Sequence, residues 1–174
     1  MKTSMSIKTC GAILAAVAAL SFTVSAEAAT KKAKTPAAPP PAIKFIASPN
    51  PASPIGAGAI VPAGSELFFV SGIPGDAKAG DTGAQTTDAL TKLGKVLTDS
   101  GYSFADVVNA KVYLVADPAT GKMDFMGMNN AFKTFFGTAG EPNKPSRVTV
   151  QIAALAAPGS LVEIELVAAK APKK

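Results

Sequence analysis

The first 41 residues differ so strongly in composition from the rest of the chain that a packed fold has to be built from residues 42–169. Residues 29–41 and 170–174 are rich in Lys, Pro and Ala and can bury little apolar area. They predict a flexible linker and a short basic tail. The remaining stretch of about 128 residues is long enough for one domain with its own core.

Residues 1–28 have the pattern of a secretory signal peptide. Lys2 and Lys8 precede an uncharged, Ala-rich run over 11–25, and Ala26-Glu27-Ala28 follows as a cleavage site. A permanent membrane helix is the alternative, but the run is shorter and less apolar than the roughly 20 residues such a helix needs. We expect a periplasmic or secreted protein with no stable membrane insertion after cleavage.

The net charge of +5 belongs to the ends of the chain. Within 42–169, eight Lys and one Arg stand against eleven acidic residues, which gives a charge of −2. Nucleic-acid binding draws on clustered basic residues, so nucleic acid is not an expected partner.

The predicted domain contains neither His nor Cys, which excludes several kinds of catalytic and metal site. The chain contains no His, and its one Cys, Cys10, lies in the predicted leader. A Ser-His-Asp triad, a Cys-His pair and imidazole or thiolate metal sites are therefore excluded from the domain. Chemistry in the domain is left to carboxylates, Lys, Arg, Tyr, hydroxyls and backbone groups.

Apolar residues alternate or recur at helical spacing along the domain. Strands are predicted over 43–47, 66–71, 107–115, 147–153 and 161–168, and helices over 85–100 and 124–136, with an additional short strand left open before 66. The Phe and Met side chains of the second helix are expected in the core. This order predicts an α+β domain, a single mixed sheet with two helices on one face. The uncovered sheet face is left for an oligomer contact or a site.

Arg147 is the only Arg in the chain, at the start of a predicted strand. Where Lys supplies every other cation, a lone Arg indicates a need for the planar fork that binds carboxylates in two places. The alternative is a salt bridge to Glu163, Glu165 or another acid. Glu163 and Glu165 also lie two apart on one predicted strand face, as a general-acid pair could.

Six short segments follow one another in a characteristic order: SPIG at 53–56, FVSGIP at 69–74, GYSFADVV at 101–108, DF and MN within 124–129, PSR at 145–147 and VEIE at 162–165. Together they resemble the RidA/YjgF family of reactive-intermediate deaminases, also described as endoribonuclease L-PSP. The resemblance covers nearly all of 43–169. It implies a chorismate-mutase-like homotrimer with clefts between subunits, and cofactor-free hydrolysis of enamines and imines such as 2-aminoacrylate to 2-keto acids and ammonia.

The resemblance also implies roles for individual residues. Arg147 would bind the carboxylate of a small 2-imino or 2-keto acid, and Glu163 would help to activate water. The remaining positions would line the pocket: Ser71, Gly72, Asn129 and Thr149.

Two segments depart from the family pattern. The stretch 56–60 reads GAGAI where deaminases of the family often carry a Tyr, and 71–73 reads SGI instead of SGQ. These departures keep a second hypothesis open, a noncatalytic module in the cell envelope that binds small carboxylates or a protein. A ribonuclease is disfavoured, because the folded part is acidic and has no His.

Overall fold

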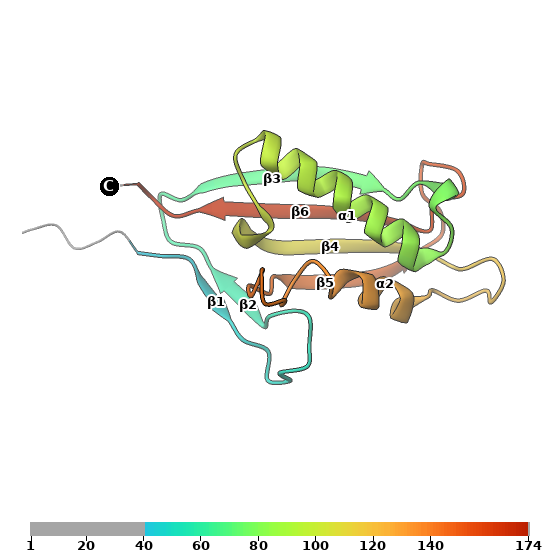
Figure 1. Ribbon diagram of the computed structural model, residues 1–174, viewed down its shortest axis with the longest axis horizontal. Coiled ribbons are helices and arrows are strands. Elements are labelled where there is room, and N and C mark those ends of the chain that lie inside the picture. The colour runs from blue at the N-terminus through green and yellow to red at the C-terminus, as the bar shows by residue number, and fades with distance from the viewer. Residues whose placement is uncertain (1–40, 174) are drawn as a thin grey trace, which may run out of the picture. The chain divides into compact units, whose positions relative to one another are not determined.

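The computed structural model describes residues 41–173 (Figure 1). The predicted leader and all but the last residue of the predicted linker lie outside these residues. The elements, in chain order, are β1 (Lys44–Ile46), β2 (Gly58–Ile60), β3 (Glu66–Pro74), α1 (Thr82–Asp99), β4 (Val107–Val115), α2 (Phe125–Phe132), β5 (Ser146–Ile152) and β6 (Val162–Lys170). Neither of the two helices in this part of the chain has the length and apolarity of a membrane span.

The main sheet has four strands in the order β3-β6-β4-β5. β6 is antiparallel to both of its neighbours, while β4 and β5 are parallel, so the sheet is mixed. β1 and β2 form a separate antiparallel pair, which supplies the short strand that the sequence left open. The predicted α+β class is confirmed, with this small second ladder beside the main sheet.

Both helices lie on the same face of the main sheet (Figure 1). Alternate residues of the central strands are buried against them, namely Ala110, Val112, Leu114, Val162, Ile164 and Leu166. Residues at i and i+2 of a strand share a face, so the intervening side chains occupy the opposite, uncovered face. The domain is therefore a two-layer structure whose core lies between helices and sheet.

α1 begins and ends at residues suited to those positions. The side chain of Asp81 accepts a hydrogen bond from the backbone N–H of Ala84 at 2.8 Å, which caps the first turn. Its buried apolar side chains, Ala89, Leu90, Leu93 and Leu97, recur at helical spacing. After the helix, Gly101 adopts a φ of +78°, a conformation that glycine reaches without strain.

α2 is shorter than predicted. The sequence predicts a helix to residue 136, but α2 ends at Phe132. Beyond it, the N–H of Thr134 donates to the carbonyl of Ala131 and that of Phe135 donates to Phe132. These bonds span three residues instead of four, so the chain tightens into turns before Gly137.

The aromatic row of this segment is divided between core and surface. Phe132 and Phe136 are buried and stack with ring centroids 4.6 Å apart, and Phe104 meets Phe136 edge-on at 5.1 Å. Phe125 is 37% exposed, so the prediction that it packs in the core is wrong. It is the first residue of α2, about two turns before Phe132.

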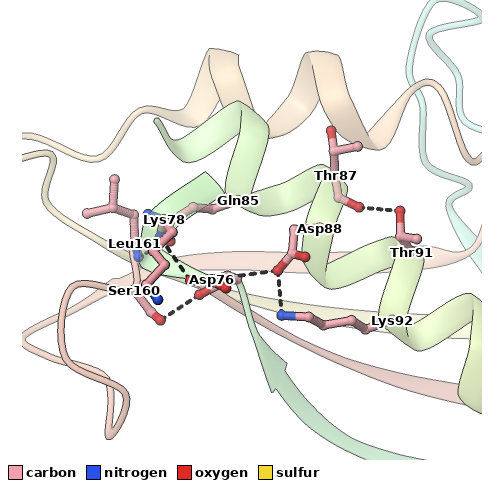
Figure 2. A network of polar contacts seen from close by, with 10 residues as sticks. Asp76, Lys78, Gln85, Thr87, Asp88, Thr91, Lys92, Ser160 and Leu161 are labelled. Atoms are coloured by element: carbon pink, nitrogen blue, oxygen red, sulfur yellow. Dashed lines mark hydrogen bonds and ion pairs between the residues drawn. The ribbon is translucent and has the colours of Figure 1, made fainter. Parts of the chain in front are cut away.

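A buried amide joins the start of α1 to the loop before β6 (Figure 2). The side chain of Gln85 donates to the carbonyls of Gly80 and Gly159, at 3.0 and 3.3 Å, and accepts from the N–H of Leu161 at 2.7 Å. Nearby, the hydroxyl of Ser160 donates to the carbonyl of Gly75 at 2.6 Å. Gln85 is only 1% exposed, so these backbone groups have no alternative partner in solvent.

We expect Gln85→Ala to lower the free energy of unfolding by about 2–4 kcal/mol, because it leaves a cavity and unpaired backbone groups. Thr91→Ala, on the exposed side of the same helix, is the matched control and should stay within about 0.5 kcal/mol of wild type. Urea unfolding followed by circular dichroism measures both. Equal, small changes in the two variants would show that the Gln85 contacts do not stabilise the fold.

Candidate functional site

Arg147 lies at the start of β5, on the helix-covered face of the sheet. In the parallel ladder it pairs with Ala110, which is fully buried beneath the helices. Its Nη2 donates a hydrogen bond of 2.8 Å to Oδ1 of Asn129, a residue of α2 that is 8% exposed. Strand and helix therefore hold the guanidinium in one place, and two predicted site residues meet there.

Aromatic rings enclose the same guanidinium. The centre of the Arg147 guanidinium lies 4.5 Å from the ring centroid of Phe132 and 5.8 Å from that of Phe125. Burial lowers the pKa of Arg147 to about 10, so the side chain is still a cation at neutral pH. The rings attract it through their electron-rich faces and fix its plane. The sequence does not predict that Phe125 and Phe132 contact Arg147. Helical spacing is the same for aromatic rings that pack in a core and for rings that surround a cation.

No carboxylate of residues 41–173 forms an ion pair with Arg147. The ion pairs within residues 41–173 join Lys92 to Asp88, Lys95 to Asp99 and Lys111 to Glu165. The alternative of a structural salt bridge from Arg147 is therefore wrong, since its partner is the neutral amide of Asn129. A cation held this way keeps its charge available for an anion.

A pocket of about 390 Å³ opens over this group. One wall is the loop of residues 50–55 and the other is α2 with Arg147. No residue of this loop is among the predicted site residues, and neither is Lys133 of the helix wall. The loop comes to lie beside Arg147 although more than 90 residues separate them in the chain, which no local pattern records.

Thr149 lies two residues after Arg147 on the same face of β5. Arg147 Nη1 and Thr149 Oγ1 are both buried and have no hydrogen-bond partner among the described residues. Buried polar groups are normally paired, and an unpaired one destabilises a protein. An acceptor that reached these two atoms would remove that cost.

Glu163 lies with Ser71 and Gly72 at a second location. A β-carbon built at Gly72 would overlap the Glu163 carboxylate, so the two residues are in close contact. Ser71 is the adjacent, exposed residue of β3, at the irregularity where the pairing with β6 shifts between Val70 and Ile73. Three of the predicted site residues therefore gather here, away from Arg147.

Glu165 is occupied by neighbours on the uncovered face. It accepts hydrogen bonds from Lys111 Nζ at 2.9 Å and from the hydroxyl of Tyr113 at 3.0 Å. The bond from Lys111 keeps the pKa of Glu165 below its usual value, against the opposing effect of burial. Glu165 is thus a structural partner, which leaves Glu163 as the free acid of the two.

Arg147 and Glu163 face opposite sides of the same sheet. Arg147 pairs with Ala110, whereas Glu163 pairs with Tyr113, three residues further along β4. An odd separation along a strand reverses the face. One copy of the chain therefore does not bring its own Arg147 and Glu163 together. No group of three or more Asp, Glu, Cys or His side chains within residues 41–173 is placed to hold a metal ion.

The stretch 56–60, where the family Tyr is missing, contains two different glycines. A β-carbon at Gly56 would lie 2.6 Å from the carbonyl oxygen of Lys144 and 2.8 Å from that of Ile46, so no side chain fits. A β-carbon at Gly58 would meet nothing within 4 Å. The segment therefore leaves open space at Gly58 on the short β2 strand.

Comparison with known proteins identifies several relatives. A 2-iminobutanoate/2-iminopropanoate deaminase of Capra hircus is 36% identical over 88 residues, 51% of this chain, and the chain spans only 57% of that protein's length. Protein DfrA of Myxococcus xanthus is 33% identical over 132 residues, 73% of this chain and 93% of that protein.

A structural neighbour confirms the fold. The crystal structure of a protein of unknown function of the Rid family, YyfB from Yersinia pestis, superposes with a TM-score of 0.58 at 24% identity, covering 74% of this chain and 98% of that one. The sequence model of the family described as endoribonuclease L-PSP matches residues 47–170. The chain therefore belongs to the RidA/YjgF (endoribonuclease L-PSP) family.

Proposed function

We propose that the protein, as an exported homotrimer, hydrolyses imine and enamine intermediates of 2-amino acids to 2-keto acids and ammonia. Arg147 binds the substrate carboxylate, and Glu163 of a neighbouring copy assists the water. The relatives named as 2-iminobutanoate/2-iminopropanoate deaminases support this reaction type at the level of the family. The observation that carries the proposal is a half-buried guanidinium, with no carboxylate partner among residues 41–173, in a pocket of about 390 Å³.

The surroundings of Arg147 suit a small planar carboxylate. The guanidinium is partly desolvated and is oriented by Asn129 and two aromatic rings, so little order is lost when an anion binds. Arg147 Nη1 and Thr149 Oγ1 both lack partners within the described chain. A charge-assisted, two-point contact to a carboxylate would supply the missing acceptor.

The reaction needs only a positioned substrate and one polarised water. The water oxygen adds to the imine carbon, and one of its protons passes by way of the Glu163 carboxylate to the nitrogen. The second proton then moves from the new hydroxyl to the nitrogen as the C–N bond breaks, which releases ammonia and leaves a 2-keto acid. An imine carbon is already electrophilic, so orientation and a single general base supply much of the rate. Each step conserves atoms and charge without an oxidant or a metal.

The uncovered sheet face supports the participation of a second copy. It exposes four large apolar side chains on the edge strands, Leu67, Phe69, Val148 and Val150, and Phe69 is 71% exposed. Apolar groups of this size on a flat sheet favour burial against another protein surface. A combined site requires this face of one copy to lie against the edge of a neighbouring copy at which its Arg147 pocket opens, because Arg147 is on the opposite face of its own sheet.

Replacing Arg147 tests the carboxylate site. With imine generated in situ by an amino-acid oxidase and trapped by semicarbazide, wild-type protein should divert the imine to keto acid. Arg147→Ala should lower kcat/KM roughly a hundredfold or more, and Arg147→Lys should recover little of it, since the fork is lost. Lys95→Ala, a cation on the outside of α1, is the control with unchanged activity.

Two outcomes would contradict hydrolysis. If Arg147→Ala turns over the imine as fast as wild type, Arg147 does not bind the substrate carboxylate. No turnover by wild type, together with Arg147-dependent binding of 2-ketobutyrate in calorimetry, would instead support the noncatalytic carboxylate-binding module.

Mixing two inactive variants tests whether the site is shared. Arg147→Ala and Glu163→Gln are each expected to be inactive as pure oligomers. After joint refolding, roughly a quarter of the sites in randomly mixed trimers should combine an intact Arg147 with an intact Glu163, and activity should return to about that level. Mixed oligomers that form but stay inactive would place both residues within one copy or remove Glu163 from the reaction.

Gly72→Ala tests the position of the Glu163 carboxylate. The added methyl group would overlap the end of a flexible side chain, so Glu163 can move aside and the fold should be retained. We expect kcat to fall roughly tenfold or more with little change in KM, because the base is displaced but the carboxylate site is not. As a control, the melting temperature of Gly72→Ala should lie within a few degrees of the wild-type value. An unchanged kcat would contradict the role of Glu163 in activating water.

A further inference from the structure

Three side chains on one face of α2 line the pocket. Phe125, Asn129 and Lys133 are spaced four residues apart, and all three belong to the pocket wall opposite the loop of residues 50–55. Residues four apart lie one above another on a helix, about one turn or 5.4 Å apart. Asn129 binds Arg147, so Lys133 stands one turn beyond the point at which the guanidinium is held.

The pocket has a strongly one-sided charge. Arg147 and Lys133 are cations, and none of the nine residues that line it is acidic. The closest acid in sequence to the start of α2, Asp124, caps that helix by accepting from the N–H of Gly127 at 2.8 Å. Two cations in one concave site attract anions and concentrate them there.

Lys133 has no ion-pair partner within the described chain. The ion pairs of residues 41–173 involve Lys92, Lys95 and Lys111. Lys133 is the C-cap residue that directly follows α2, and it is exposed. An exposed lysine is commonly just solvated, but this one lines the same pocket as an unneutralised Arg147. Its ammonium is a flexible point charge, suited to a group that need not be held in a fixed plane.

We infer that Lys133 binds a second anionic group of the substrate, so that the preferred substrates are imines of dicarboxylic 2-amino acids. One carboxylate lies on Arg147 next to the reacting carbon, and the other lies on Lys133. This inference rests on the proposed hydrolysis. Water adds to the imine carbon, ammonia leaves and a dicarboxylic 2-keto acid is formed, while the second carboxylate takes no part in bond making.

The test compares two imines in the semicarbazide competition assay. The dicarboxylic imine is generated from L-aspartate, and the monocarboxylic imine from 2-aminobutanoate, each by an amino-acid oxidase. Wild type, Lys133→Gln, Lys133→Arg and the matched control Lys95→Gln are measured with both. Lys95 is on the exposed side of α1 and does not line the pocket, so its replacement removes the same charge from a different surface.

Wild type should have the higher kcat/KM for the dicarboxylic imine. Lys133→Gln should lower the ratio of the two kcat/KM values roughly tenfold, mainly through KM, as expected when a pocket loses one charge contact. Lys133→Arg should keep most of the preference for the dicarboxylic imine, and Lys95→Gln should keep all of that preference.

The remaining outcomes overturn the inference in distinguishable ways. If wild type turns over both imines and Lys133→Gln leaves their ratio unchanged, the second-anion site is wrong and the proposed hydrolysis stands. If wild type turns over neither imine, the proposed hydrolysis fails and the inference fails with it. If Lys133→Gln breaks the oligomer in size-exclusion chromatography with light scattering, Lys133 pairs with an acid of a neighbouring copy.

Discussion

The parallel pairing of β4 with β5 determines what surrounds Arg147. In this register Arg147 lies beside the buried Ala110 and beneath α2, where Asn129 and Phe132 contact its guanidinium. A slip of one residue would turn Arg147 to the uncovered face and put the apolar Val148 under the helix. The chemistry of the pocket thus depends on the register of this backbone ladder, which places the polar residues of β5, and not its apolar ones, on the helix-covered face.

β6 has the complementary effect on the other face. Its apolar residues pack into the core, and that burial turns Glu163 and Glu165 outward. Glu165 is then neutralised by Lys111 and Tyr113, whereas Glu163 lies against Gly72. The same alternation that builds the core therefore separates the acid from Arg147. In the proposed oligomer, a second copy would cover the four exposed apolar side chains around this face.

The strands were predictable from the sequence because alternation is a direct record of burial. The strand predicted over 107–115 matches β4 in both bounds. Arg147 stands out in the sequence because it is the only Arg of the chain. The end of α2 and the position of Phe125 were not predicted correctly. A helical period reports that one side of a helix is apolar, but the same period results when rings enclose a cation at the rim of a pocket.

The sequence by itself determined the α+β class, the likeness to the RidA/YjgF family, the absence of histidine chemistry and the identity of the one residue with a carboxylate-binding fork. Local spacing and residue type are sufficient for these, because each depends on segments of fewer than about 20 residues. The tertiary structure decided that Arg147 has an amide and not an acid as its partner, that Lys133 lines the same pocket, and that Glu163 faces away. These relations join residues of different strands and helices that are 14 to 18 positions apart in the chain. Spacing along the chain does not predict them, because strand register and helix packing decide which of these side chains meet.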